Sequence, residues 1–455
     1  MEYSSYTCKC RSDTGSTERQ RRNLVICIDG TSNKCGIANT NVIKLHSQIL
    51  KDESDEQLTY YDSGIGTYAT PTGMSLSHLM LVMQNKVDMV IAWNLEKVII
   101  GAYQWLSNHY REGDKIFLFG FSRGAFQVRA LAGMIETVGL LLPGNESQIP
   151  FAYQHYVNHD AAGKDRYLAP TFKEMLSRRG ARVHFIGVWD TVSSVGLMRP
   201  KKILPRIAEC CNHVCYFRHA LALDERRVKF LPEYVHEGKS HALGEPLFPG
   251  QGKCTADIKE VWFAGTHSDV GGGNRLNTDP QLGDTPLLWM RNEATMAGLR
   301  LEAADVNWKM INLKRDPTPP LSGIWNVLEQ FPIRRLSYQG HHSATTRRLH
   351  RGKSRKIVEG QMIHASVIFR PGYKPSPAFP KDMGTWPAQL HWDDPDREKR
   401  LWELEKSHEI WEKDLFDHSA AKDLFEQLRH DQQNSARVLE RIAFMTSSGQ
   451  LRFAS

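Results

Sequence analysis

The stretch KIFLFGFSRGA, residues 115–125, decides the fold expected for this chain. Its first five residues form an apolar run typical of a buried strand, and residues 125 to about 141 have helical spacing. Between them lie Gly120, Ser122 and Gly124. A serine in a sharp strand-to-helix turn crowds its neighbours, so the positions two before and two after it must be nearly free of side chain. The two glycines meet this need, and the serine hydroxyl is expected to project above the sheet.

Short apolar runs alternate with helical stretches on both sides of this segment. Strands are predicted at residues 24–28, 58–61, 115–119, 182–189, 260–265 and 363–369, and helices at 88–110, 125–141 and 284–299. The alternation is typical of an α/β protein with a mostly parallel central sheet flanked by helices. Polar or Gly-rich residues follow most of these strands. Because ligands of open parallel sheets sit beyond the carboxyl ends of the strands, these tips should share one crevice.

Length and composition predict one large folded unit with appendages. The chain has 455 residues, of which 41% are hydrophobic and 24% charged, so it can bury a sizeable core. We expect a flexible arm at residues 1–22, an α/β domain at 22–375 and a helical C-terminal extension at 376–455. Apolar positions in the extension recur irregularly at three- and four-residue steps, which favours docked helices over a coiled coil.

Charge and patterning argue against several other classes of protein. The net charge of +7 tilts the surface only mildly toward anionic partners, so no nucleic-acid partner is expected. No run of 18 apolar residues is present, and the first 22 residues lack the pattern of a secretory signal. Eight cysteines do not form a disulfide framework. These features predict an intracellular, cytoplasmic protein with no signal peptide or transmembrane segment.

A strand, then Gly-x-Ser-x-Gly, then a helix is the nucleophile elbow of α/β-hydrolases. Ser122 is therefore the candidate nucleophile. The N–H of Arg123 opens the helix, where it is unpaired and favoured by the helix dipole as a donor to an oxyanion. The turn at Gly30 and Thr31 is the candidate for the second oxyanion donor.

A serine nucleophile needs a base within about 3 Å and an orienting carboxylate. Asp190 ends an apolar strand, and His267 follows another strand beside a glycine run. The chain order Ser122, Asp190, His267 is that of α/β-hydrolases. Alternatives stay open. His364, placed just before a last strand, is a second candidate for the base, and Asp269 or Asp29 for the acid. Asp29 would otherwise bind a cation or hold its turn.

Six motifs occur in order along residues 22–300. They are IDGTSN (28–33), GIGT (64–67), GFSRGA (120–125), VWDTV (188–192), HALALDERR (219–227) and WFAGTHSDVGGG (262–273). Together they resemble a widespread, mostly uncharacterised α/β-hydrolase family, whose bacterial members include the Tle1-like phospholipase effectors of type VI secretion and which has related proteins in fungi. The resemblance implies a lipase-like serine hydrolase acting on phospholipid esters, with Ser122 as nucleophile and Asp190 and His267 as acid and base. It does not extend to residues 301–455.

The function expected is cleavage of carboxylic esters, of lipids or phospholipids, through a Ser-His-Asp triad and an acyl-enzyme, without a metal or organic cofactor. Two alternatives remain. One is a non-catalytic binding or regulatory protein on a hydrolase scaffold. The other is a metal-dependent hydrolase that uses Asp29, Asp269 and His267.

Two charged segments give weaker indications of function. Eight cationic residues and no acid lie between Arg334 and Lys356, a composition that suits peripheral contact with an anionic membrane and equally a solvated loop. The block DERR at 224–227 is expected to be helical and to form ion pairs within the chain.

Overall fold

A computed structural model of the whole chain describes residues 21–30, 36–51, 56–64, 95–159, 165–178, 180–192, 214–235, 256–279, 281–302 and shorter pieces between 315 and 367. The expected C-terminal extension and nearly all of the expected N-terminal arm lie outside these residues. The strands of the main sheet are β1 (Asn23–Ile28), β2 (Gln57–Asp62), β3 (Lys115–Phe121), β6 (Val183–Trp189), β7 (Val214–Ala222), β8 (Asp257–Phe263) and β11 (Met362–Ile363).

Two helices lie close to the expected ranges 125–141 and 284–299, namely α3 (Arg123–Val138) and α7 (Asp284–Met296). Four further helices were not expected: α1 (Asn41–Ser47), α4 (Ile149–Val157), α5 (Asp165–Leu176) and α6 (His267–Gly271). The 3₁₀ turns are η1 (Glu146–Gln148) and η2 (Val228–Phe230). Residues 95–109 are also helical. Two small antiparallel sheets join β4 (Leu140–Leu141) to β5 (Ser177–Arg178) and β9 (Arg335–Ser337) to β10 (Ala344–Thr346). Among the described helices, none has the length and apolar character to span a membrane.

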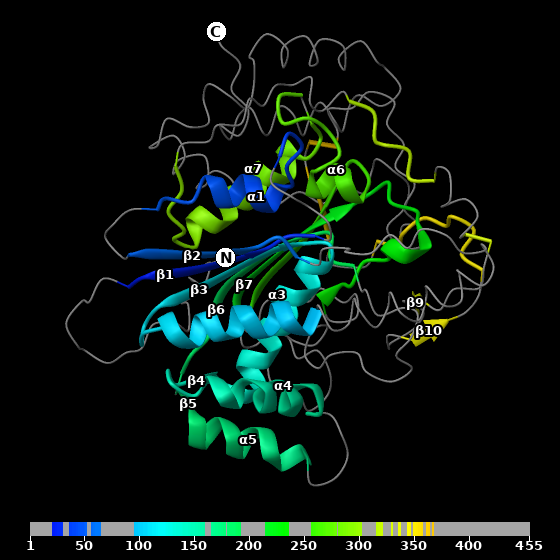
Figure 1. Cartoon of the computed structure of the whole chain (residues 1–455). Helices are drawn as coiled ribbons and strands as arrows, with labels where there is room; N and C mark the ends of the chain where they lie inside the picture. The colour runs from blue at the N-terminus through cyan, green and yellow to red at the C-terminus, as the bar shows by residue number, and fades with distance from the viewer. Residues whose placement is uncertain are drawn as a thin grey trace, which may run out of the picture.

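The main sheet has seven strands in the order β11-β8-β7-β6-β3-β1-β2, and every pair of neighbours is parallel. Helices cover both faces, with α1 and α7 on one and α3 on the other, while α4 and α5 lie beyond α3 (Figure 1). The α/β fold with a parallel central sheet is confirmed. All the strand ends that carry the motifs therefore meet at one edge of the sheet.

Strand β1 is apolar from Leu24 to Ile28, as expected for a central strand with both faces buried. Leu24, Ile26 and Ile28 belong to the core shared with α3, whereas Val25 and Cys27 belong to the core shared with α1 and α7. All five side chains are fully buried. Burial raises the pKa of the Cys27 thiol well above its usual range, as expected for an inert core cysteine.

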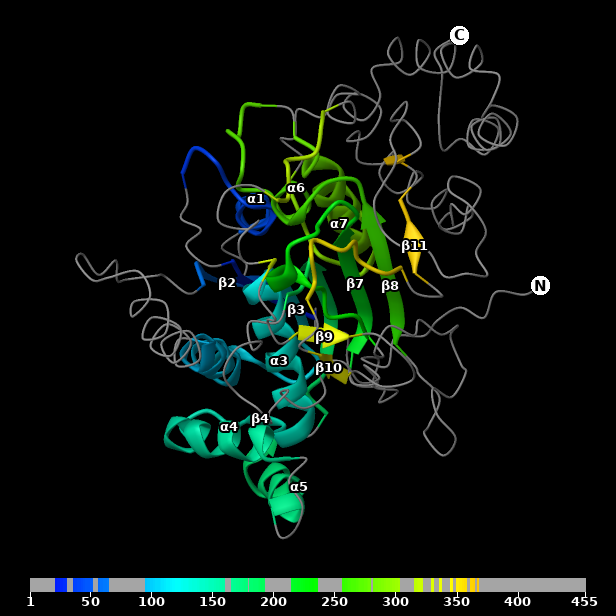
Figure 2. The same cartoon turned by 90° about the vertical axis from the view of Figure 1, so that its right-hand side faces the viewer.

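The last strand is shorter than expected. Strand β11 spans Met362–Ile363, pairs with Val261 and Trp262 of β8, and lies beside β8 at one edge of the sheet (Figure 2). His364 therefore follows this strand and does not precede it.

Strand β7 was not expected, because Arg218 and His219 interrupt its apolar pattern. Both side chains are buried and paired. Arg218 forms ion pairs with Asp257, at 3.0 Å, and with Glu293 of α7. His219 contacts Glu260 with 2.9 Å between Nδ1 and Oε1. Pairing offsets the cost of burying polar and charged groups inside a sheet, so these residues are tolerated in a central strand.

Candidate active site

Ser122 lies in a strained turn between β3 and α3. Its φ is 59° and its ψ is −119°, a backbone conformation that residues other than glycine rarely adopt. A Cβ on Gly120 would lie 2.6 Å from the carbonyl oxygen of Gly124, and one on Gly124 would lie 2.2 Å from that of Ile28. Both positions therefore require glycine. Ser122 keeps 8% of its surface exposed.

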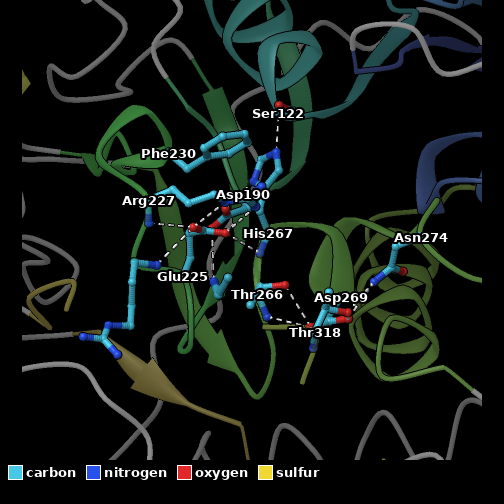
Figure 3. Close-up of polar contacts among 12 residues, drawn as sticks. Ser122, Asp190, Glu225, Arg227, Phe230, Thr266, His267, Asp269, Asn274 and Thr318 are labelled. Carbon is cyan, nitrogen blue, oxygen red and sulfur yellow. Dashed lines mark hydrogen bonds and ion pairs between the residues drawn. The ribbon is translucent and has the colours of Figure 1, made fainter. Parts of the chain in front are cut away.

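The side chains of Ser122, His267 and Asp190 form one hydrogen-bonded chain (Figure 3). Nε2 of His267 lies 2.8 Å from Oγ of Ser122, and its Nδ1 lies 2.5 Å from Oδ2 of Asp190. A carboxylate can only accept, so Nδ1 carries the proton and donates to Asp190. Nε2 is then free to accept the proton of the Ser122 hydroxyl. Ser122 and Asp190 lie at the ends of β3 and β6, and His267 is the first residue of α6, which follows β8.

Asp190 is fully buried and has a positive φ of 42°. It accepts the N–H of Ala222 at 3.1 Å and two bonds from Arg355, at 2.5 Å to Oδ1 and 2.9 Å to Oδ2. Burial by itself would raise the pKa of this carboxyl. The positive charge of Arg355 and the hydrogen bonds from His267 and Arg355 outweigh burial and hold the pKa well below its usual range. Asp190 is thus ionised.

The turn after Asp190 is held by His219 of β7. Nε2 of His219 accepts the backbone N–H of Thr191 at 3.0 Å, while its Nδ1 faces Glu260. Burial lowers the pKa of His219, and the opposing effect of Glu260 is smaller. A neutral imidazole with the proton on Nδ1 satisfies both partners.

Two aromatic rings enclose the His267 imidazole. The centre of the Phe121 ring lies 4.6 Å from the centre of the imidazole. The Phe230 ring lies edge-on to the imidazole, with 4.7 Å between the two ring centres. Arg227 covers Phe230, with its guanidinium carbon 3.8 Å from the ring centre. The ring can therefore turn little without displacing its neighbours.

Glu225 joins this wall to the backbone of His267. Its Oε2 accepts the His267 N–H at 3.1 Å and pairs with Arg227 at 2.6 Å. Burial would raise the pKa of Glu225, but the bonds and charge of Arg227 lower it overall. The ion pairing expected within the DERR block is confirmed. The helix expected there is wrong, because residues 223–227 form a turn and loop that let Glu225 reach across.

The two rival acids each hold a turn. Asp269 accepts the N–H and hydroxyl of Thr266 at the start of α6, and it also binds Asn274 and Thr318. Asp29 accepts the N–H of Gly30 at 2.6 Å and the hydroxyls of Thr40 and Tyr61. Among the described residues, no three His, Cys, Asp or Glu side chains are grouped to hold a metal ion. The set Asp29, Asp269 and His267 is not such a group.

The rival base, His364, is oriented by its own loop. Its Nδ1 accepts the N–H of Ser366 at 3.2 Å and lies 2.9 Å from the Ser366 hydroxyl. Its ring stacks on Phe263 at 4.7 Å.

The oxyanion donors expected from the sequence differ in what they already bind. Arg123 is the first residue of α3, so its N–H has no acceptor within the helix. The Gly30 N–H already donates to the side chain of Asp29. Thr31 lies outside the described residues.

Sequence reasoning missed Arg355, Phe230 and His219 as site residues, whereas it expected the DERR block, which contains Glu225, to hold the walls of the site by ion pairing. Arg355 was grouped with a surface patch, yet it is only 2% exposed, so that part of the expected patch is wrong. No local pattern marks which cation of the run is buried.

Residues 22–293 match the family described as "T6SS, Phospholipase effector Tle1-like, catalytic domain". The chain belongs to this family. The resemblance expected from the six motifs is thereby confirmed. Ser122, Asp190 and His267 lie inside the matched range, whereas Arg355 and Thr318 lie beyond it.

Two proteins similar to this Tle1-like chain are described as uncharacterized. "Uncharacterized protein YEL023C" of Saccharomyces cerevisiae is 37% identical over 219 residues, which cover 46% of this chain and 32% of the yeast protein. An uncharacterized protein from Pseudomonas aeruginosa of known crystal structure is 20% identical, with a TM-score of 0.32, over 62% of this chain and 46% of that chain. The chain thus spans about a third of the length of its yeast relative.

Proposed function

We propose that this protein is a serine hydrolase that cleaves carboxylic esters through an acyl-enzyme. The observation that carries the proposal is the unbroken chain from Ser122 Oγ through His267 to Asp190, with links of 2.8 Å and 2.5 Å. These distances suit proton transfer without further movement of the side chains. A strained serine turn, an imidazole placed to accept the serine proton and an ionised buried carboxylate are what nucleophilic catalysis by serine needs.

Each step follows from an atom of the site. His267 Nε2 takes the Ser122 proton as Oγ attacks the ester carbonyl, and Asp190 stabilises the imidazolium that forms. The Arg123 N–H and the start of α3 receive the oxyanion. His267 then protonates the leaving alcohol. Water, activated by the same imidazole, releases the acid from Ser122.

The family supports a lipid ester as the substrate, since its description names a phospholipase effector. Arg123, directly after the nucleophile, adds a cation at this site. Burial lowers the pKa of its guanidinium to about 10, so it stays charged at neutral pH. Contact with an anionic membrane is a further proposal, for which Arg351, Lys353 and Lys356 are the exposed cations among the described residues of the patch.

A fluorophosphonate probe tests the proposal on the full chain. We expect labelling of the wild type and none of Ser122→Ala, with hydrolysis of a panel of soluble esters and phospholipid vesicles lost in parallel. Ser147, on the exposed 3₁₀ turn η1, supplies the control. Ser147→Ala should label like the wild type.

Failure of folded wild-type protein to react with the probe or with any ester would contradict the proposal, and binding without turnover would then favour a regulatory protein on the same scaffold. Activity that a chelator abolishes and serine reagents leave intact would select a metal-dependent hydrolase.

A further inference from the structure

The acid of the triad is bound on two sides. His267 contacts only Oδ2 of Asp190, whereas Arg355 contacts both oxygens through Nη1 and Nη2. The Arg355 guanidinium also donates to the carbonyl oxygens of Ala222, at 3.1 Å, and Phe230, at 2.5 Å. A planar fork bound to both carboxylate oxygens fixes the plane of the carboxylate as well as its position.

Arg355 comes from a strap, residues 349–357, that lies beyond the range matched by the family. Polar contacts hold the strap against the loop after β7. Glu329 accepts from the N–H of Val228 and of Gly352 and contacts His350. The Tyr234 hydroxyl donates to the carbonyl oxygen of Lys356 at 2.7 Å.

We propose that Arg355 is a positioning residue of the triad, which aims the Asp190 carboxylate at His267 and offsets the negative charge that the imidazole faces. This inference rests on the proposed hydrolase function. A guanidinium behind the carboxylate weakens the negative potential that the imidazole experiences. In a variant without the guanidinium, the carboxylate charge would act on the imidazole unopposed and would favour the imidazolium.

The charges around His267 form a balanced set. Asp190 and Glu225 are the carboxylates that contact it, at its side chain and its backbone. Arg355 pairs with the first, and Arg227 pairs with the second. The uncharged rings of Phe121 and Phe230 pack against the His267 imidazole. Within the described residues, Arg355 is thus the cation bound directly to the carboxylate that orients the base.

The experiment separates the positive charge of Arg355 from its bidentate contact with Asp190. In the full-length protein, Arg355→Met removes both the charge and the bidentate contact, whereas Arg355→Lys keeps the charge and loses the bidentate contact. The control is Arg111→Met, which removes an exposed cation from the turn before β3. For each protein, kcat/KM for a soluble ester and the rate of fluorophosphonate labelling are measured against pH, per active site counted by burst titration.

In Arg355→Met we expect the acidic limb of the profile of kcat/KM against pH to shift its midpoint upward by about one pH unit. We also expect the rate on the plateau of this profile to fall. Arg355→Lys should keep the wild-type midpoint while its plateau rate falls by about tenfold or more, because the carboxylate is no longer held in plane. Arg111→Met should match the wild type in both.

A different result is that Arg355→Met keeps the wild-type midpoint and loses activity only because fewer molecules are active, each at the normal rate. That result would make Arg355 a structural residue and would overturn the inference. If Arg355→Met does not fold, an unchanged plateau rate in Arg355→Lys overturns it in the same way. If the wild type is active and both Arg355 variants match it in midpoint and plateau rate, the hydrolase proposal stands and the role of Arg355 is disproved. A wild type with no labelling removes both.

Discussion

The backbone N–H of Ser122 donates to the carbonyl oxygen of Trp189, 3.0 Å away, and Asp190 follows directly. The Asp190 N–H in turn donates to Ala220 at 2.7 Å. The hydrogen bonds of the sheet therefore continue past the strands into both strained turns. The register of β3, β6 and β7, with Phe121 opposite Trp189 and Trp189 opposite Ala220, places the nucleophile and the acid side by side.

Replacing the acid should separate catalysis from stability. Asp190→Asn leaves Nδ1 of His267 without its acceptor, so we expect kcat to fall by about 10⁴-fold with little change in KM. It also leaves Arg355 buried without a counter-ion, at a cost of about 3 kcal/mol or more in the free energy of unfolding. Steady-state kinetics and thermal unfolding measure the two effects. Turnover near that of the wild type would shift the role of the acid to Asp269 or Asp29.

The double variant Asp190→Asn/Arg355→Met should recover stability without recovering activity. Removing both charges eliminates the unpaired guanidinium, so the two losses in unfolding free energy should not add. Denaturant unfolding of the four proteins in this cycle gives the coupling energy. Simple additivity would mean that the ion pair is not formed in solution.

The ring of Phe230 should matter for catalysis through the orientation of His267. Phe230→Ala removes the edge-on contact, and we expect kcat/KM to fall by about tenfold as the imidazole gains freedom. Phe151 on α4 is 52% exposed and provides a matched control. If Phe151→Ala and Phe230→Ala lose activity equally, the ring contact has no special role.

The two candidate bases are distinguished by one pair of variants. His267→Gln should lower kcat by about 10⁴-fold or more, because Ser122 loses its proton acceptor. His364→Gln should leave labelling by a fluorophosphonate unchanged, since His364 contacts Ser366 and Phe263. The opposite ranking of the two labelling rates would transfer the role of base to His364.

The buried ion pair predicts how stability depends on pH. The pKa of Asp190 is lower in the folded chain than its unfolded value near 3.9, so its contribution is complete above that value and is lost as the pH falls through the folded pKa. Relative to Asp190→Asn/Arg355→Met, the wild type should lose on the order of 2 kcal/mol of unfolding free energy between about pH 5 and pH 2. A constant difference between the two proteins over this range would contradict the prediction.

Strand β7 illustrates where prediction from sequence failed. Its residues Arg218 and His219 resemble polar positions of a surface helix until their partners are known. Those partners, Asp257, Glu260 and Glu293, lie on β8 and α7, at least 39 residues away. A pattern of apolar residues cannot reveal that a charge will be paired inside the sheet.

The sequence by itself determined the parallel α/β sheet, the serine turn and the order of the three candidate residues. These depend on short-range physics: apolar runs that must be buried and glycines that only fit where side chains cannot. Only the tertiary structure decided that Arg355 meets Asp190 across 165 residues, that Phe230 packs on His267 and that Asp269 and Asp29 hold turns. Such contacts depend on strand register and loop path, and one cation in a run of eight looks the same in sequence whether it is buried or exposed.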